Sequence, residues 1–132
     1  MSGALVLDSE GLTKAVQRDR EVHERLTAAR DADLPVITSA AVLVEVIHPR
    51  TNDAALKWTL SRLRVEPVTQ ALAQSAAGLL RGTGLHGHKY AIDAMLCAAA
   101  LAQPSRATIL TSDGEDIGML TASHSRVAIE KV

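Results

Sequence analysis

Four acidic residues of this 132-residue chain stand in apolar surroundings, where carboxylates are uncommon. Asp8 ends the run Ala-Leu-Val-Leu, and Asp113 follows the run Thr-Ile-Leu-Thr-Ser. Glu45 lies in Ala-Ala-Val-Leu-Val-Glu-Val-Ile, and Asp93 lies in Tyr-Ala-Ile-Asp-Ala-Met-Leu-Cys-Ala. Both segments have the composition expected of apolar helices. Because a buried carboxylate is costly unless it is paired, hydrogen-bonded or metal-bound, these four acids are the candidates for chemistry.

Basic partners for these acids are scarce in the sequence. Neither Asp8 nor Asp113 has a basic residue within four positions. Several carboxylates at one point repel each other unless a cation neutralises them, and oxygen ligands without His or Cys favour Mg²⁺ or Mn²⁺. One such ion, or two about 4 Å apart, can bind a phosphodiester, activate water and stabilise the leaving oxygen.

The elements that must position the acids alternate between short strands and helices. Strands are expected at 4–7, 36–38, 65–68, 108–110 and 127–129, with the third at an edge because it contains Pro67. Helices are expected at 10–30 (broken or ended at Asp19 or Asp31), 40–47 (capped by Thr38 or Ser39), 52–63, 69–81, 89–102 and 112–120 (capped by Ser112). This order predicts the α/β class: a single three-layer domain over 1–132, with a parallel sheet of about four to five short strands flanked by helices.

The predicted fold brings the acids together. In open α/β sheets, ligands bind at the carboxyl ends of the strands, near the point where the strand order reverses. Asp8 and Asp113 stand at two such ends, and Glu45 and Asp93 lie on helices long enough to reach the same edge. We therefore expect the four acids to form one metal site.

The ordered set of acidic motifs resembles that of a PIN domain. The motifs are Leu-Val-Leu-Asp8-Ser, Ala-Val-Leu-Val-Glu45-Val, Ala-Ile-Asp93-Ala-Met-Leu-Cys and Thr111-Ser-Asp113-Gly-Glu-Asp116-Ile, and they span essentially the whole chain. The group most similar to it is that of the VapC-like toxins of bacterial type II toxin–antitoxin systems. The resemblance implies a PIN-like fold and a metal-dependent endoribonuclease, dimeric and held inactive by a small antitoxin.

The resemblance also implies roles for individual residues. Asp8, Glu45, Asp93 and Asp113 would be the catalytic acids and, with Asp116 in support, the ligands of Mg²⁺ or Mn²⁺. Thr111 resembles the family hydroxyl that precedes the acid and would hold a carboxylate by a hydrogen bond; the alternative is that it merely ends its strand. The RNA substrate would meet a thin and scattered basic surface, for which the candidates are Arg50, Lys57, Arg62, Arg64, Arg81, His86, His88 and Lys89.

Composition narrows the function further. With one Trp, one Tyr and no Phe, the chain lacks the aromatic surface on which single-stranded nucleic acids stack. The net charge of −1 means that polyanion binding must rest on a local basic patch or on metal ions. The single Cys97, expected in the core, excludes an intrachain disulfide and a cysteine-based zinc site.

No targeting segment is visible, and the longest apolar run, 94–102, is far below the ~20 residues of a membrane span. The sequence therefore predicts a cytoplasmic protein without a membrane partner. A mean hydropathy of +0.10 with alanine-rich helices favours a homodimer, for which the helices 40–47 and 52–63 are the candidate contacts. Trp58 in the second helix would serve packing or an interface.

Each motif has a structural alternative. Asp8 could cap the first helix, Glu45 could pair with His48 or Arg50, and Asp93 could pair with Lys89 one turn back. Ser112 and Glu115 have the spacing of a capping box, in which Asp113 and Asp116 would only favour the helix dipole.

Other functions fit the sequence less well. The segment Gly82-Thr-Gly84-Leu-His-Gly87 matches G-x-G-x-x-G, but it follows a helix rather than a strand, so it does not indicate dinucleotide binding. It is either a plain surface loop or a mobile loop at the rim of the site that contacts phosphate. His86 and His88 could not bind zinc by themselves, because the sequence offers no evident third nitrogen or sulfur ligand. A phosphoacceptor site at Asp8 lacks a second strand-end acid and a Lys. A PIN-like module that binds RNA or a protein without cutting is the main alternative.

Overall fold

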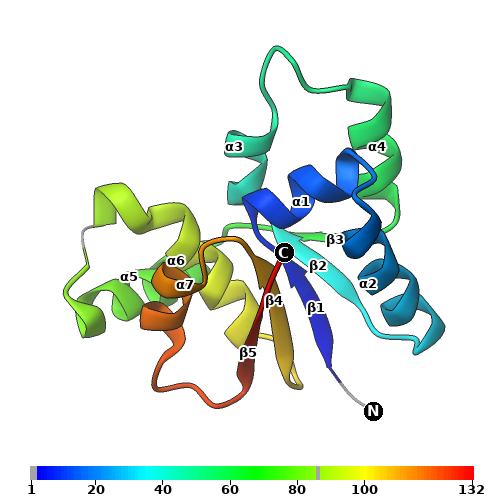
Figure 1. Ribbon diagram of the computed structural model, residues 1–132. Helices are drawn as coiled ribbons and strands as arrows, with labels where there is room; N and C mark the ends of the chain where they lie inside the picture. Colours follow the sequence, from blue (N-terminus) through cyan, green and yellow to red (C-terminus); the bar gives the residue numbers. More distant parts are fainter. Residues whose placement is uncertain (1–2, 86) are drawn as a thin grey trace.

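One parallel five-stranded sheet with the order β3-β2-β1-β4-β5 forms the centre of the computed structural model, which describes residues 3–85 and 87–132 (Figure 1). All four pairings between neighbouring strands are parallel. The strand bounds are β1 Ala4–Leu7, β2 Val36–Ser39, β3 Arg64–Glu66, β4 Ala107–Thr111 and β5 Val127–Lys131. The predicted α/β class is therefore confirmed. β3 lies at an edge as predicted, but it covers Arg64–Glu66 rather than 65–68 and ends before Pro67.

Helices connect the strands and cover both faces of the sheet. α1 and α2 pack on one face of β1 and β4, and α6 packs on the other face of β2 and β4, with α5 against its outer side (Figure 1). The helix bounds are α1 Ser9–Val16, α2 Arg20–Asp31, η1 Ala40–Val42 (a 3₁₀ turn), α3 Leu43–Val46, α4 Asp53–Ser61, α5 Gln70–Thr83, α6 Gly87–Leu101 and α7 Gly114–Thr121. This arrangement gives the three layers that the alternating sequence predicts.

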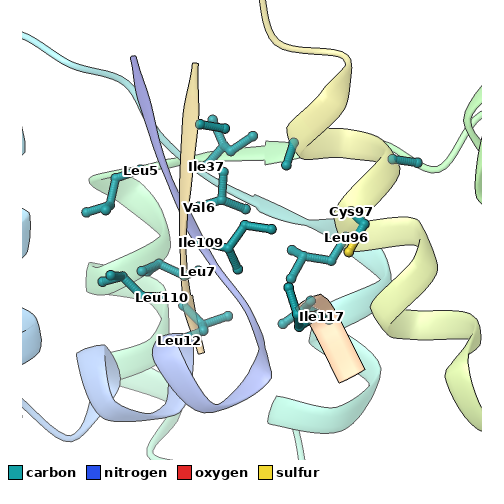
Figure 2. Close-up of a cluster of buried hydrophobic side chains, with 14 of the residues drawn as sticks. Leu5, Val6, Leu7, Leu12, Ile37, Leu96, Cys97, Ile109, Leu110 and Ile117 are labelled. Carbon is teal, nitrogen blue, oxygen red and sulfur yellow. The ribbon is translucent and has the colours of Figure 1, made fainter. Parts of the chain in front are cut away.

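The core is aliphatic and lies on both sides of β1 and β4. Because successive side chains of a strand point to opposite faces, Val6 and Ile109 meet Leu96 of α6, whereas Leu5 and Leu110 point toward the face of α1 (Figure 2). All four residues of β1 are buried, as expected for a strand that is covered on both faces. Cys97 is fully buried in this core, which confirms its predicted place.

The strand register sets the geometry of the carboxyl edge. Leu7 of β1 lies opposite Leu110 of β4. The next residues, Asp8 and Thr111, therefore emerge side by side at the centre of the sheet. The amide of Asp8 donates to the Leu110 carbonyl at 3.3 Å, which continues the pairing to this point.

Local sequence signals predicted most helix ends, with two corrections. The break expected at Asp19 is confirmed: Arg18 takes a left-handed φ of 60°, the Asp19 carboxylate caps α2 by accepting from Val22 N at 3.1 Å, and α2 ends at Asp31. The expected helix 40–47 is only η1 and one turn of α3, which ends before Pro49. Ser112 does not cap α7; Asp113 takes that position without a side-chain capping bond.

The other predicted caps form. Ser39 accepts from Ala41 N at 3.2 Å, and Thr69 accepts from Leu72 N at 3.1 Å. Thr38, the other candidate before η1, instead donates its hydroxyl to the Leu7 carbonyl at 2.7 Å and ties β2 to β1. Within the described ranges, no helix has the length and apolarity that a membrane crossing requires.

Candidate metal centre

Asp8 stands at the end of β1, buried and held by two donors. Its Oδ1 accepts a hydrogen bond from Gly11 N at 2.8 Å, so Asp8 caps α1. This capping role is the structural alternative stated for Asp8 in the sequence analysis. The Thr111 hydroxyl forms a second hydrogen bond with the carboxylate. Burial raises the pKa of Asp8 above its ordinary value, and the hydrogen bonds from Thr111 and Gly11 oppose that rise. Asp8 therefore caps α1 and also contributes its charge to the acidic cluster around Asp93.

Thr111 connects two of the acids. Its hydroxyl bonds Asp8, and its Oγ1 accepts from the backbone N of Asp113 at 2.9 Å. The residue is fully buried at the end of β4, so its rotamer is fixed by packing. Thr111 thus does more than end its strand, because one side chain sets both the Asp8 carboxylate and the start of the turn that carries Asp113.

Asp93 lies at the electrostatic centre of the cluster. Its pKa is raised from 3.8 to about 6, mainly by burial. The negative charges of four other acids add to the rise: Asp113, Asp8, Glu45 and Asp116. Four other acids thus lie close enough to disfavour its charge. The pairing of Asp93 with Lys89 is not found: no ion pair joins them in the part of the chain that is described.

Asp113, at the N-cap position of α7, and Asp116, in its first turn, complete the cluster. One carboxylate oxygen each of Asp93, Asp113 and Asp116 lies within 4.8 Å of the others. The pKa of Asp116 is raised by its side-chain hydrogen bond with Asp113, and the Lys89 charge opposes that rise. No side-chain capping bond forms at the start of α7, but Asp113 holds the N-cap position and Asp116 lies in the first turn, so both acids also favour the helix dipole.

Glu45 differs from the prediction in its surroundings. We expected a buried acid on a long apolar helix, but α3 is a single turn, Glu45 is exposed, and the adjacent Val44 is 77% exposed. Its charge contributes to the raised pKa of Asp93, but neither Glu45 nor Asp8 belongs to the group of Asp93, Asp113 and Asp116 whose oxygens lie within 4.8 Å of one another. Oε1 accepts a hydrogen bond from the Ser9 hydroxyl rather than pairing with His48 or Arg50. Ser9 is the site residue that the sequence reasoning missed; its place directly after Asp8 was the available signal.

The candidate RNA contacts remain scattered. Arg50 is exposed between α3 and α4, Arg81 is exposed near the end of α5, and His88 and Lys89 are exposed in the first turn of α6. Among the candidates that the structure describes, Lys89 lies near the acids, because its charge lowers the pKa of Asp116. His86 falls outside the described residues. The Gly-rich segment is shorter than expected, since α5 runs to Thr83 and α6 begins at Gly87, with Gly84 at a left-handed φ of 70°.

The donor set fits a hard divalent cation. The cluster offers carboxylate oxygens, and the nearby Cys97 thiol has its pKa raised to about 12 by burial and by the charges of Asp93 and Asp8, so it stays protonated. Oxygens on opposite sides of a Mg²⁺ ion are about 4.2 Å apart. The 4.8 Å spread of the Asp93, Asp113 and Asp116 oxygens is therefore close to the span of one ion. The repulsion that raises the pKa of Asp93 is also the repulsion that such an ion would relieve.

Comparisons with known proteins agree with this geometry. No curated protein matches the sequence. A chain of the crystal structure of VapBC2 from Rickettsia felis bound to a DNA fragment from their promoter superposes with a TM-score of 0.69 at 16% identity, covering 98% of each chain, which shows a shared fold. The PIN domain family model matches residues 5–117, a range that contains the whole acidic cluster. The chain therefore belongs to the PIN domain family.

Proposed function

We propose that this chain is a Mg²⁺-dependent endoribonuclease and the toxin of a type II toxin–antitoxin pair, with residues 1–132 acting as one cytoplasmic nuclease domain. The observation that carries the proposal is the group of Asp93, Asp113 and Asp116, whose carboxylate oxygens lie within 4.8 Å of one another. Burial, together with the charges of Asp113, Asp8, Glu45 and Asp116, raises the pKa of Asp93 to about 6. An acidic cluster at the carboxyl edge of a parallel sheet repels phosphate by itself, so it needs a cation to act on a phosphodiester.

The acids of the cluster have different roles in the proposed reaction. Asp93, Asp113 and Asp116 would hold the cation, and Mn²⁺ would serve in place of Mg²⁺ because both prefer oxygen ligands. When bound, the ion neutralises the acids, polarises the phosphodiester and activates the attacking water. Asp8 is preorganised by Gly11 and Thr111, and Glu45 is oriented by Ser9, so neither carboxylate has to be reordered as substrate arrives.

RNA would reach this edge across exposed basic residues. Lys89 lies close enough to the cluster to lower the pKa of Asp116, which supports a contact between its ammonium group and an RNA phosphate at the site. Arg50, Arg81 and His88 are exposed and free to contact phosphates further along the strand, and His86 is proposed on sequence alone. Because the chain carries a net charge of −1, the bound cation rather than overall charge would dominate substrate affinity.

Two protein partners belong to the proposal. The resemblance to VapC-like toxins, together with the fold shared with the VapBC2 chain, supports a small antitoxin that blocks the site. A second copy of this chain is supported by the exposed apolar side chains of Val44 in α3 (77% exposed) and of Ile47 directly after it (51% exposed). Apolar side chains exposed to this degree on neighbouring positions favour a surface that is covered in an assembly.

The experiment is cleavage of end-labelled RNA by purified protein with Mg²⁺, with excess EDTA, and with Mg²⁺ restored. We expect cleavage in the first and third reactions only. Cleavage that persists in EDTA would contradict the mechanism, and RNA binding without cleavage under all conditions would favour the binding module instead.

Asp31→Asn is the matched control for substitutions in the cluster. Asp31 is exposed at the end of α2 and has no place in the acidic cluster. Its variant should cleave RNA at the wild-type rate, so that loss of activity in a cluster variant cannot be attributed to the removal of any one negative charge.

A further inference from the structure

Gly11 occupies a helix position at which alanine would be the more favourable residue. It is buried in the first turn of α1, and glycine is among the least favourable residues in a helix. The backbone does not require glycine there, since the described glycine with a left-handed φ is Gly84. The reason for a glycine must therefore lie in the space around it.

The backbone of β4 occupies the space that a side chain at Gly11 would need. A Cβ atom on Gly11 would lie 2.9 Å from the Leu110 carbonyl oxygen and 3.4 Å from Asp8 Oδ1. Real Cβ atoms essentially never approach another atom to within 3.0 Å. The Leu110 oxygen cannot move aside as the end of a flexible side chain could, because β4 is paired with a strand on each side. Gly11 thus allows α1 to approach β4 more closely than a residue with a side chain would.

The same carbonyl oxygen fixes the end of β1. Leu110 O accepts a hydrogen bond from Asp8 N at 3.3 Å, and Leu7 lies opposite Leu110 in the strand register. A Cβ atom at residue 11 would either push α1 away from β4 or turn this carbonyl group away from Asp8 N. Either movement would displace Asp8 relative to Thr111, the next residue of β4.

Gly11 also contacts the Asp8 carboxylate directly. Its backbone N–H donates to Asp8 Oδ1 at 2.8 Å, beside the hydrogen bond from the Thr111 hydroxyl. Hydrogen bonds to an ionised acceptor are stronger than those between neutral groups. Gly11 therefore acts on Asp8 in two ways, through a donated hydrogen bond and through the close approach that its lack of a side chain permits.

The rest of α1 leaves little freedom to relieve a clash at residue 11. Leu12 and Ala15 are buried in the hydrophobic core, where packing is dense. A shift of the whole helix would disturb these contacts. We therefore expect the strain to be relieved at the start of the helix, where Asp8 lies.

We propose that Gly11 is a positioning residue of the candidate metal centre. Its lack of a side chain lets α1 begin against the Leu110 carbonyl, and this approach holds the Asp8 carboxylate where it can serve a divalent ion. The inference rests on the metal-dependent function proposed above. It predicts that one added methyl group at residue 11 weakens metal binding, and that it does so through Asp8.

Calorimetric Mg²⁺ titration of wild type, Gly11→Ala, Asp8→Asn and the double variant tests this coupling. Gly11→Ala should weaken Mg²⁺ binding at least about tenfold, because it disturbs a hydrogen bond to a charged group. In the Asp8→Asn background the same substitution should change the affinity less than about twofold, since the carboxylate through which Gly11 acts is gone. Equal losses in the two backgrounds would overturn the proposal.

Gly78→Ala is the matched control. Gly78 is exposed in α5, and nothing outside the adjoining helix backbone lies within 4 Å of the position of its Cβ atom. This variant should bind Mg²⁺ like wild type and melt at the same temperature or higher, because alanine favours a helix. A Gly11→Ala protein that binds Mg²⁺ as tightly as Gly78→Ala would also overturn the proposal. A wild type that binds no Mg²⁺ would instead contradict the proposed function itself.

Nuclear magnetic resonance of wild type and Asp8→Asn decides the question if Gly11→Ala does not fold. Glu10-Gly11 is the only Glu-Gly pair in the sequence, so ¹³C-carbonyl glutamate with ¹⁵N-glycine gives a single linked amide signal. The signal should move upfield in Asp8→Asn, because the N–H then donates to a neutral group instead of a carboxylate. Mg²⁺ should shift the wild-type signal. A signal that Asp8→Asn leaves unmoved would overturn the proposal, whether or not the protein binds Mg²⁺.

Discussion

The hydroxyl of Ser9 donates a hydrogen bond to Oε1 of Glu45, which joins the first residue of α1 to α3, the short helix that follows β2 and η1. Asp8 and Glu45 are thereby linked through adjacent backbone positions. Glu45 is exposed, and the helices that carry it, η1 and α3, are too short to hold its side chain in one orientation. The Ser9 contact therefore supplies the orientation that helix packing does not.

Ser9→Ala should weaken the proposed metal site without unfolding the protein. A hydrogen bond of this kind contributes about 0.5–1.5 kcal/mol, so we expect Mg²⁺ affinity to fall about two- to tenfold. Calorimetric Mg²⁺ titration measures the effect, with RNA cleavage at limiting Mg²⁺ as a second readout. Ser9→Thr should restore most of the affinity because it keeps the hydroxyl, and Ser75→Ala on the exposed surface of α5 should match wild type. Equal Mg²⁺ affinities of Ser9→Ala and Ser75→Ala would show that Ser9 has no positioning role.

Asp8→Asn should abolish RNA cleavage and leave the fold intact. Asparagine caps a helix about as well as aspartate, so the bond from Gly11 N to residue 8 can persist. Removal of one charge also relieves repulsion on Asp93. The measurements are cleavage rate and melting temperature, with Asp31→Asn as the control. Wild-type turnover by a pure Asp8→Asn preparation would remove Asp8 from the mechanism.

Metal-free stability should depend on the ionisation of Asp93. Its pKa is raised from 3.8 in the unfolded chain to about 6 in the fold, so the folded state holds the proton more tightly. The contribution of this proton to the free energy of unfolding is complete below about pH 4 and is lost as pH rises through 6. With allowance for solvent screening of this half-buried group, the loss is about 1–2 kcal/mol.

The comparison of wild type with Asp93→Asn isolates that contribution. In EDTA, the variant should gain stability relative to wild type between pH 4 and 7, as measured by urea unfolding. In Mg²⁺ the wild type should recover, because the bound ion compensates the repelling charges. A stability difference that is independent of pH would contradict the placement of Asp93 at the centre of the acids.

Val44→Lys should dissociate the proposed homodimer. The side chain is 77% exposed on α3, so a charge there costs little in the monomer but is unfavourable in a covered apolar surface. Light scattering at micromolar concentration should give a dimer mass for wild type and a monomer mass for the variant. Val68→Lys is the matched control, since Val68 is also an exposed valine but precedes α5. A monomeric wild type would refute the dimer.

The sequence predicted the parts of the site that follow from strand ends. Asp8 and Asp113 could be placed because apolar runs that stop at an acid mark the carboxyl ends of buried parallel strands. Asp93 could be placed because α6 is long and strongly apolar, as its buried alanines and Cys97 confirm. These signals are local, and the fold that joins them follows a general rule of α/β sheets.

The parts that could not be predicted depend on contacts between distant segments. The apolar character of residues 40–47 suggested a buried helix, but Val44 and Ile47 are exposed. An apolar sequence alone does not show whether a helix face packs in the core or forms an interface with another protein. The bond between Ser9 and Glu45 spans 36 positions and leaves no periodic signal.

The central claim is that acids from separate segments form one site for a divalent ion at the carboxyl edge. Anomalous diffraction from crystals of the protein soaked in Mn²⁺ tests it most directly. The account predicts a peak bounded by the carboxylates of Asp93, Asp113 and Asp116, with Asp8 and Glu45 facing it directly or through water, and no such peak in crystals of Asp93→Asn. A Mn²⁺ peak at another place on the protein, or carboxylates that point to different surfaces, would contradict it.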